Sequence, residues 1–450
     1  MVFPIAGGNE SKEYEISNSL RFNDGDSPIL TRTPSSAGDT QKFTYSTWFK
    51  RSVISSESYP FLNAGSNASN YFRLNFESND TIGAFSVSGG STDFEYVTTQ
   101  VFRDPSAWYH LVFAVDTTNG TEGNRLRLYI NGSEVTSFST ETHPSQNLST
   151  DINGTTAHYI GRRTPANDGF YDGYLTETHL VDGSQLAPTS FGEFDDNGVW
   201  VPIKYTGTYG TNGYFLQFKQ TGTSQNSSGI GADTSGNDNH YAVTNIAAHD
   251  ITEDTCTNNF ATLNSLFRSR FDNDGQLREG SSQIAFTADN ANRGYGFASF
   301  GVTSGKWYWE VKITTVARAN TGIGDATAIA AFTGPLYDES TSKGFIVNYS
   351  GGIEENGTST SYANSLSDND IVMWALDMDN HRAYYGINGT WQDSGNPTSG
   401  STGTGDVTTQ ISDQSHLNTG EPMFPFCLDA STSGQSNFKW NFGNPPFSIS

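Results

Sequence analysis

Two segments of the chain repeat one pattern of apolar and polar positions. Each begins with an apolar run, continues through an acidic turn into an aromatic-rich alternating run, and ends at an Asn-Gly pair; they are residues 108–132 and 371–389. Asn-Gly favours a two-residue hairpin turn because both central residues of that turn need positive φ. The repeated pattern therefore predicts two related all-β modules.

Strand-like segments on either side of these hairpins predict further strands, and the two that alternate in polarity, at 19–22 and 43–51, are expected to be half-buried. In the first half the strand-like segments are residues 19–22, 43–51, 71–76, 81–87, 94–99, 157–163 and 173–183. In the second half they are residues 294–313, 343–352 and 424–443. The Pro-, Ser- and Gly-rich stretch between the first two strands predicts a turn region.

The middle of the chain has a mixed character. A strand-like run at 209–218 is followed by a polar, Gly-rich stretch, and apolar residues keep returning up to about residue 280. A floppy linker of this length is uncommon inside compact proteins. We therefore predict a β-sandwich over residues 1–195, an irregular, packed connector with short strands over 196–280, and a second antiparallel β-sandwich over 281–450.

Composition agrees with a folded all-β protein and excludes several partners. Apolar residues make up 34% of the chain, aromatic residues 13% and charged residues 16%, which is typical of short strands with Phe and Tyr in the cores. The net charge of −24 is spread along the chain and repels nucleic acid and anionic membranes. We expect no nucleic-acid partner and no membrane insertion, since no run of 18 apolar residues occurs. The first eight residues, MVFPIAGG, lack the features of a secretory signal.

The sequence contains two cysteines, Cys256 and Cys427. Two cysteines cannot provide a disulfide framework for a chain of this size. Cys427 lies in the apolar run MFPFCLDA, which predicts a buried free thiol there.

The first half resembles a known family. The segments SLRF, TYSTWFKR, WYHLVFAVD, RLRLYINGSEV, YIGRR and FYDGYLTETHLVDG follow the order typical of the laminin-G-like, concanavalin A-like lectin/glucanase family. From residue 15 to about 265 the chain resembles a form frequent in virion proteins of tailed phages, on the segments NSLRFNDGDSPILTRTPSSAG, LAPTSFGEFDDNGVWVPIKYTGTYGTNGYFLQF, ADTSGNDNHYAVTN and DTCTNNFATLNSL.

Residues 295–443 resemble a SPRY domain. The motifs are SGKWYWEVKI, DIVMWALDMDNHRAYYGINGTW and the closing FPFCLDA and FKWNFG. The Ala- and Gly-rich run at 317–337 departs from the family, which has a tighter strand there. Both resemblances imply concanavalin-like sandwiches of jelly-roll type, so the expected fold class is all-β.

Candidate catalytic residues do not form a recognised site. The related glucanases place two carboxylates at alternate positions of one strand. The nearest string is Glu193, Asp195 and Asp196 in GEFDDNGVW, which predicts a surface turn, and Glu310 is a lone acid on an aromatic strand. Nucleophile-elbow, metalloprotease, phosphate-loop and CxxC motifs do not occur. We expect that the protein is not an enzyme.

Two oxygen-rich clusters are candidate calcium sites, because Ca²⁺ takes carboxylate, amide and carbonyl oxygens. They are Asn23, Asp24 and Asp26 in RFNDGDS, and Asp233, Asn237 and Asp238 in ADTSGNDN. The alternative is structural, since Asp and Asn side chains also cap the backbone amides of turns. We expect no required cofactor, with structural calcium as the one candidate.

Three loops combine an aromatic ring with a polar neighbour, as saccharide sites do. They carry Tyr171 with Asp172, Tyr209 with Asn212, and Trp391 with Asn388. Trp391 is the best placed, because it follows the Asn-Gly turn and precedes a long polar run. The alternative is that these rings fill the cores or fold back onto the sheets.

Together these features predict a non-enzymatic virion protein on the exterior of a tailed phage. It would decorate the capsid or form a fibre-like appendage, contact other virion proteins and adhere to host surface glycans through loops on rigid scaffolds. Such a protein is expected to form a homo-oligomer, and a trimer is one candidate. The alternatives are a purely structural capsid-cement or tail component and a glycan-degrading enzyme with an unrecognised site.

Overall fold

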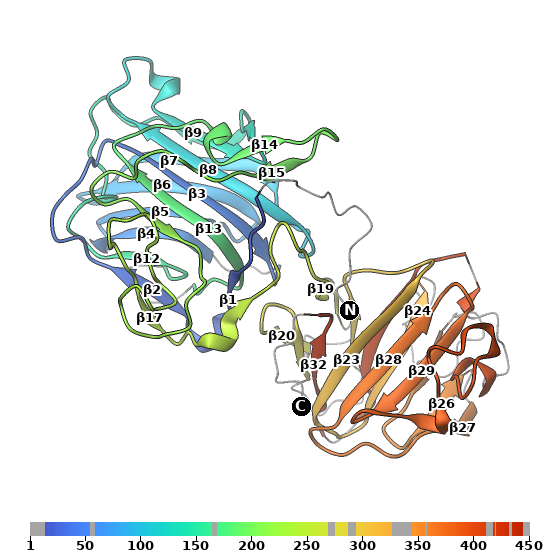
Figure 1. Cartoon of the computed structure of the whole chain (residues 1–450). Helices are drawn as coiled ribbons and strands as arrows, with labels where there is room; N and C mark the ends of the chain where they lie inside the picture. Colours follow the sequence, from blue (N-terminus) through green and yellow to red (C-terminus); the bar gives the residue numbers. More distant parts are fainter. Residues whose placement is uncertain are drawn as a thin grey trace. The chain divides into compact units, whose positions relative to one another are not determined.

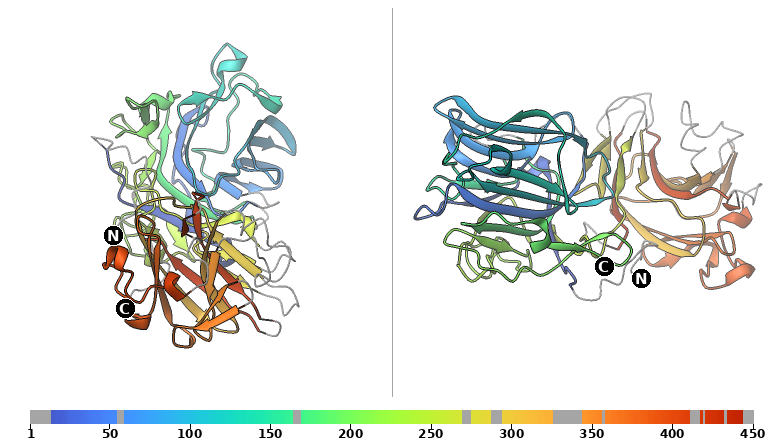
Figure 2. Two further views of the ribbon diagram at one scale, coloured as in Figure 1. Left: turned by 90° about the vertical axis from the view of Figure 1, so that its right-hand side faces the viewer. Right: turned by 90° about the horizontal axis from the view of Figure 1, so that it is seen from above.

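The chain folds into two compact units, one ending at Asn259 and one beginning at Phe260. The computed structural model describes residues 14–54, 59–163, 169–268, 275–286, 294–325, 344–355, 358–410, 417–418, 420–431 and 434–443. Figures 1 and 2 show β-strands throughout both units. In the described residues no helix is long and apolar enough to cross a membrane.

The first unit consists of two antiparallel sheets with a hydrophobic core between them. Over the described residues sheet A has the order β10-β9-β8-β3-β13-β1-β18, and β16 also pairs with β13. Its strands are β1 (Ser19–Phe22), β3 (Lys42–Arg51), β8 (Trp108–Asp116), β9 (Leu126–Ile130), β10 (Ser133–Glu134), β13 (Gly173–Asp182), β16 (Tyr214–Leu216) and β18 (Ile251–Thr252).

Sheet B has the order β11-β7-β6-β5-β4-β12-β2-β17 in the described part of the chain. Its strands are β2 (Ile29–Arg32), β4 (Tyr59–Asn67), β5 (Asn70–Phe76), β6 (Thr81–Ser88), β7 (Ser91–Val101), β11 (Phe138–Thr142), β12 (His158–Ile160) and β17 (Ala242–Thr244). A separate hairpin, β14 (Gly192–Phe194) and β15 (Trp200–Pro202), projects from this unit in Figure 1. Short 3-10 helices lie at η1 (Asp24–Asp26), η2 (Glu122–Asn124), η3 (Pro188–Ser190) and η4 (Ala248–Asp250).

Aromatic rings join the two sheets of the first unit. Phe49 of sheet A lies 5.0 Å from Phe61 and 5.3 Å from Phe76 of sheet B, measured between ring centroids, and all three are fully buried. Phe43 meets Phe72 edge-on at 6.0 Å. The inward positions of the alternating strands thus supply the core, as expected from their pattern.

The second unit also consists of two antiparallel sheets, C and D, over its described residues. Sheet C is, in order, β19 (Leu263–Arg268), β22 (Gly294–Ala298), β31 (Met423–Asp429), β24 (Ala319–Asp325), β25 (Gly344–Val347), β26 (Gly352–Glu355) and β27 (Thr358–Ser361). Sheet D is β20 (Gly275–Arg278), β21 (Gln283–Phe286), β32 (Asn437–Asn441), β23 (Lys306–Thr315), β28 (Ile371–Asp377), β29 (Arg382–Ile387) and β30 (Thr390–Trp391). Its short helices are η5 (Gln392–Ser394), η6 (Gly400–Thr402) and η7 (Thr408–Gln410).

Trp374 of β28 links sheets C and D. Its indole nitrogen donates a hydrogen bond to Thr321 Oγ1 of β24 at 3.0 Å, and its ring lies 6.1 Å from that of Phe345 on β25. Cys427 of β31 is a buried free thiol, as its apolar surroundings predicted. The predicted all-β class with two sandwiches is confirmed.

Both predicted hairpins are present and end in the same turn. Asn131 and Gly132 have φ of 48° and 78°, and Asn388 and Gly389 have φ of 49° and 81°. In each turn the Asn side-chain oxygen accepts a backbone N–H at 2.8 Å, from His110 in one hairpin and Ile371 in the other. The Asn therefore closes the turn with its side chain as well as supplying the backbone conformation.

The outer face of sheet A is covered, which the sequence did not predict. We call residues 186–219 the covering segment; its rings Phe191, Tyr209 and Phe215 pack with Val112 and Val181 of the sheet. All residues of β13 are consequently buried, and nine of the ten in β3. The expectation of half-buried strands at 19–22 and 43–51 was therefore wrong: every residue of β1 and all but one of β3 are buried, because segments distant in the sequence pack over their polar side chains.

Residues 196–280, expected to be a connector, contribute strands to both units. Strands β16, β17 and β18 join strands of the first unit, whereas β19 and β20 belong to the second. The division after Asn259 thus differs from the boundaries expected at residues 195 and 280. The strands β16, β17 and β18 have only two or three residues each, too few for alternation to mark them in the sequence.

Two further segments were assigned from the sequence, the turn region before residue 43 and the run at 317–337. The turn region expected between the first two strands contains β2, which pairs with β12 and β17. The Pro- and Ser-rich flanks obscured this four-residue strand. Of the run at 317–337, residues 326–337 lie outside the described residues, as do residues 1–8.

Candidate functional site

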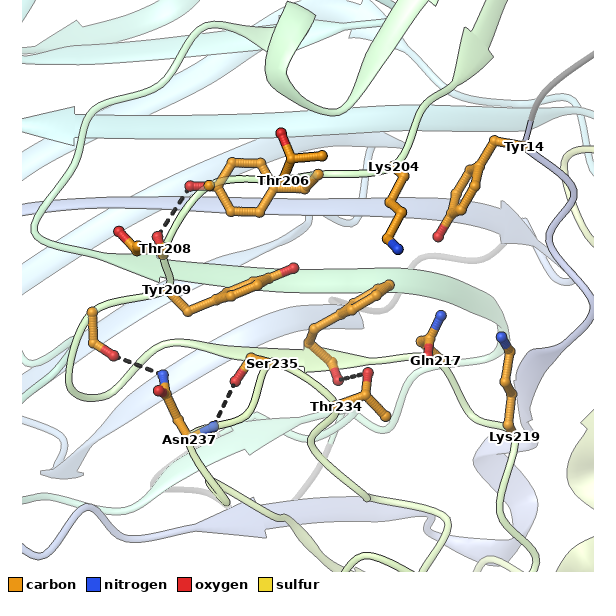
Figure 3. Close-up of a pocket in the computed structure, with 14 residues that line it drawn as sticks. Tyr14, Lys204, Thr206, Thr208, Tyr209, Gln217, Lys219, Thr234, Ser235 and Asn237 are labelled. Carbon is orange, nitrogen blue, oxygen red and sulfur yellow. Dashed lines mark hydrogen bonds between the residues drawn. The ribbon is translucent and has the colours of Figure 1, made fainter.

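A cavity of about 730 Å³ opens in the first unit between the covering segment and the loop at 234–237. This volume falls within the range of roughly 300–1,000 Å³ typical of ligand sites. Figure 3 shows its lining, which consists of Tyr14, Lys204, Tyr205, Thr206, Gly207, Thr208, Tyr209, Gly210, Phe215, Gln217, Lys219, Thr234, Ser235 and Asn237.

The pairing of β16 with β13 forms one wall of the cavity. Tyr214 lies opposite Leu180 and Phe215 opposite His179, so that Gln217 and Lys219 continue beyond the paired residues. At the other end, the amide N–H of Asp182 donates to the carbonyl oxygen of Tyr209 at 2.9 Å. The loop between residues 203 and 213 is thereby fixed to the sheet at its end.

Asp233 fixes the opposite loop. Its Oδ1 accepts the backbone N–H groups of Phe215 and Ser235, both at 2.8 Å. Its Oδ2 accepts the Ser235 hydroxyl at 2.9 Å and the Asn239 N–H at 2.8 Å. Asn237 then donates its side-chain amide to the carbonyl oxygens of Gly210 and Gly213 at 2.7 and 3.0 Å. The cavity is therefore held open by hydrogen bonds within the protein.

Aromatic rings form the floor. The rings of Tyr209 and Phe215 stack on His179, with centroids 5.9 and 4.1 Å away, and the Tyr209 hydroxyl lies 2.8 Å from His179 Nδ1. Tyr205 stacks on Phe191 at 5.0 Å, and its hydroxyl donates to the Thr208 carbonyl at 3.1 Å. These contacts restrict both tyrosine rings before any ligand arrives.

Tyr14 closes the side of the cavity next to a buried carboxylate. Its hydroxyl donates to Glu177 Oε2 at 2.6 Å, and the same oxygen lies 3.8 Å from His179 Nε2. Glu177 sits at the β13 bulge with φ of 46° and is 5% exposed. Burial, and then the charge of Glu177, raise the pKa of Tyr14, so this phenol stays protonated as a donor.

The polar lining carries positive charge. Lys204 and Lys219 are both exposed, and none of the described residues that line the cavity is Asp, Glu or His. Figure 3 shows the Lys204 ammonium group beside Tyr14, with Gln217 and Lys219 on the same side of the cavity. The described lining offers aromatic rings, amide and hydroxyl groups and two cations, and it includes no carboxylate or imidazole.

The structure separates the sequence-predicted saccharide residues. Tyr209 lines the cavity as expected of an aromatic binding residue. Its proposed neighbour Asn212 is 3% exposed, donating its backbone N–H to Asp182 Oδ2 at 2.9 Å and accepting from Arg32 at 3.2 Å. Tyr171 is fully buried in the core and Asp172 is 2% exposed. Asn212, Tyr171 and Asp172 therefore cannot contact an external sugar, which corrects that prediction.

The two predicted calcium clusters differ in how their side chains are used. The four hydrogen bonds to Asp233 occupy its carboxylate, Asn237 bridges the two glycine carbonyls, and Asp238 lies 3.6 Å from His240. In the other cluster, Asn23 donates its amide to Asp26 Oδ2 at 2.7 Å, and Asp24 begins η1. Among the described residues no group of three or more His, Cys, Asp or Glu is arranged to hold a metal ion. The turn alternative describes Asp233 and Asn237, whose side chains hold backbone groups, and calcium at Asn23, Asp24 and Asp26 stays a prediction.

Trp391 and Asn388 lie together on the second unit, as their proximity in sequence requires. The half-buried Trp391 ring meets Tyr308 edge-on at 6.3 Å and packs over Gly386. Asn388 uses its side chain to accept from Ile371 and to donate to Asp370 at 2.7 Å. The ring folds back onto the sheet, the alternative considered from the sequence, and its role in binding stays a prediction.

Sequence reasoning missed Tyr14, Tyr205, Lys204, Gln217 and Lys219. They come from segments that lie up to 205 residues apart in the chain, between Tyr14 and Lys219. One signal was available. Between Arg51 and Gly305 the sequence contains only two lysines, Lys204 and Lys219, and both line the cavity.

Residues 23–187 match the family model of the concanavalin A-like lectin/glucanases superfamily, of laminin G type. The N-terminal domain is concanavalin A-like. This agrees with the sandwich and with the laminin-G-like motif order in the sequence, and the matched residues include most of sheets A and B.

Solved structures are similar to parts of the chain. The SPRY domain of human HERC1 is 17% identical over 40% of this chain and 98% of its own, with a TM-score of 0.28. A protein from Bacteroides ovatus whose proposed role is carbohydrate binding is 15% identical over 53% of this chain and 60% of its own, with a TM-score of 0.37. A pentraxin from Limulus polyphemus is 15% identical over 39% of this chain and 80% of its own, with a TM-score of 0.28.

Proposed function

We propose that this protein binds saccharides through the cavity of its concanavalin A-like domain, without hydrolysing them. The observation that carries the proposal is the lining itself. The rings of Tyr205 and Tyr209 line a preformed hollow together with hydroxyl and amide groups. A sugar ring has the complementary surface, with apolar C–H faces and a polar edge of hydroxyl groups. The family match of the domain to concanavalin A-like lectins and glucanases supports the same ligand class.

The absence of carboxylate and imidazole groups from the described lining supports binding over hydrolysis. Glycoside hydrolysis uses two carboxyl groups on either side of the scissile bond. Glu177 lies below the lining, and its Oε2 is engaged by the Tyr14 hydroxyl. We therefore propose a binding protein. Release of reducing sugar from host polysaccharide by the purified protein would contradict this part of the proposal.

Filling the cavity provides a direct test. Thr206 is exposed on its rim, and a Trp there would occupy the space beside Tyr209. Thr206→Trp should lose at least about tenfold in affinity for saccharides found on a glycan array, measured by calorimetry. The matched control is Thr244→Trp on β17, also exposed but outside the lining, which should bind as the unmodified protein does. Equal binding by both variants would exclude the cavity.

We further propose that the protein is an exterior component of a tailed-phage virion and mediates adhesion to host surface glycans. This rests on the sequence resemblance over residues 15–265. A homo-oligomer, for which a trimer is one candidate, would place several cavities on one particle, and multivalency would raise the avidity of weak single sites. Antibodies against the purified protein should label the surface of intact particles, and mass photometry should give a multiple of the 48.9 kDa chain. Unlabelled particles would exclude this location.

A further inference from the structure

The two cavity lysines stand out against the charge of the chain. Asp and Glu number 48 and Lys and Arg 24, so a cavity with the average composition of this chain would contain more acidic than basic residues. The cavity instead has two lysines and no carboxylate among its described lining residues. A positive site on a protein of net charge −24 raises the local concentration of anions that the rest of the surface repels.

The other described lysines of this domain are used within the fold. Lys50 Nζ lies 2.9 Å from Asp254 Oδ2, and Lys42 Nζ lies 3.1 Å from Asp116 Oδ2. Lys204 and Lys219 form no ion pair with any residue that the structure describes, and both side chains are exposed. Their ammonium groups are therefore available to a ligand.

Two acidic groups beside the cavity are already engaged. Glu177 accepts the Tyr14 hydroxyl at 2.6 Å, and Asp233 accepts four hydrogen bonds from Phe215, Ser235 and Asn239. Neither carboxylate is part of the lining. Glu177 reduces the positive potential, but the lining itself keeps the two lysines.

We infer that the ligand of this cavity is an acidic saccharide, bound with its ring against Tyr205 and Tyr209 and its anionic group at the end that carries Lys204 and Lys219. This inference rests on the proposed function and specifies its ligand class. Figure 3 shows the two regions of the cavity, with Thr208, Tyr209 and Asn237 at one side and Lys204, Gln217 and Lys219 at the other. A lysine binds carboxylate, sulfate and phosphate alike as a point charge.

The contribution of each lysine to the affinity depends on how exposed its side chain is. An exposed ion pair contributes less to affinity than a hydrogen bond to a charged group that is shielded from water. The lysines lie at the rim of a partly enclosed site, so each should contribute roughly three- to tenfold in affinity. The contribution should decline as salt rises from about 0.05 to 0.5 M, because the screening length shortens.

The test compares a hexuronic acid oligosaccharide with the same oligosaccharide after its carboxyl groups are reduced to alcohols. Calorimetry on the full chain should give at least about tenfold tighter binding of the acidic form. Lys204→Gln and Lys219→Gln should each remove part of this preference and together remove nearly all of it. Lys42→Gln is the matched control, since it removes the same charge outside the cavity and should keep the preference.

Further ligands distinguish the source of the anion and separate the two proposals. Lysine-dependent binding of sulfated or phosphorylated oligosaccharides in place of the uronate would support the inference and assign the group. Equal binding of the acidic and reduced forms by all variants would overturn it and leave saccharide binding standing. Competition by inorganic polyphosphate as strong as by the oligosaccharide would also overturn it. Absence of binding to every saccharide would refute the proposed function itself.

Discussion

The indole nitrogen of Trp200 donates a hydrogen bond to Nδ1 of His110 at 3.0 Å. The proton of the neutral imidazole therefore resides on Nε2, which donates to Ser46 Oγ at 2.8 Å. The ring lies between those of Trp48 and Trp200, with centroids 4.8 and 6.0 Å away. This relationship joins the covering segment to sheet A, and it depends on His110 remaining uncharged.

The stability of the first unit should decrease as the pH falls below about 6.5. Burial lowers the pKa of His110 to about 3, and the pKa of His158 to about 4. Between these values and about 6.5 the unfolded chain binds protons that the folded chain does not, so the unfolding free energy falls by about 1.4 kcal/mol per pH unit for each histidine. At neutral pH both histidines are uncharged in either state and the effect vanishes.

Hydrogen exchange with mass spectrometry at pH 7, 6 and 5 measures this, because peptides from residues 14–259 report the first unit separately. His249→Gln is the control, since this exposed histidine should contribute little to the slope. An opening free energy that stays constant from pH 7 to 5 would contradict the role given to the buried histidines.

Lys50→Met should destabilise the first unit by about 3–5 kcal/mol, because removing one partner of a buried ion pair leaves a buried charge. Asp254, fully buried, would lose the ammonium group and keep the Trp108 indole at 3.0 Å. The comparison is Lys42→Met, whose pair with Asp116 is partly exposed and should be worth less than about 1 kcal/mol. Urea unfolding measures both variants. Similar losses of unfolding free energy would contradict the expectation that burial makes the Lys50–Asp254 pair the more costly one to break.

The two Asn-Gly turns offer a matched pair of glycines. Gly389 has φ of 81°, and a methyl group added there would meet only open space, so Gly389→Ala should cost only the backbone strain of about 1–2 kcal/mol. Gly132 has φ of 78°, and a methyl group there would lie 2.3 Å from the Trp200 ring. Gly132→Ala should cost more and disturb the Trp200–His110 hydrogen bond. If thermal unfolding gave the same loss of stability for both substitutions, the Trp200 ring would have to move away from the added methyl group at no energetic cost.

Trp391→Ala separates the two candidate saccharide sites. The ring packs over Gly386 and meets Tyr308 at its edge, so its loss should weaken the second unit slightly. Saccharide affinity should remain unchanged if the cavity of the first unit is the site. A large loss of affinity in the folded variant would instead assign binding to the tip of the second hairpin.

Chelation of calcium should leave the melting temperature unchanged. An ion bound only to the folded state would stabilise it by mass action. The Asp233 carboxylate already accepts four protein hydrogen bonds, which leaves it poorly placed to take a cation as well. Differential scanning fluorimetry with millimolar Ca²⁺ and with EDTA provides the comparison, and a clear upward shift with Ca²⁺ would revive the calcium hypothesis.

Local sequence determined the elements that depend on local chemistry. Strand-like patterns marked the long strands β3, β5, β7, β13 and β23. Asn131 and Asn388 marked the turns, because tolerance of positive φ is a property of the residue at that point in the chain. The all-β class and the buried thiol of Cys427 follow from the same kind of pattern.

Tertiary structure alone decided which face of sheet A is exposed and where a ligand can enter. The three-residue strand β16 pairs with β13 across more than thirty residues, and this pairing places Tyr209 at the surface of the cavity. Tyr171, equally aromatic and also in a polar loop, is instead drawn into the core. Lys204 and Lys219 become one site only when the covering segment folds back over the sheet. Such outcomes depend on packing between distant segments, so the pattern around each residue could not determine them.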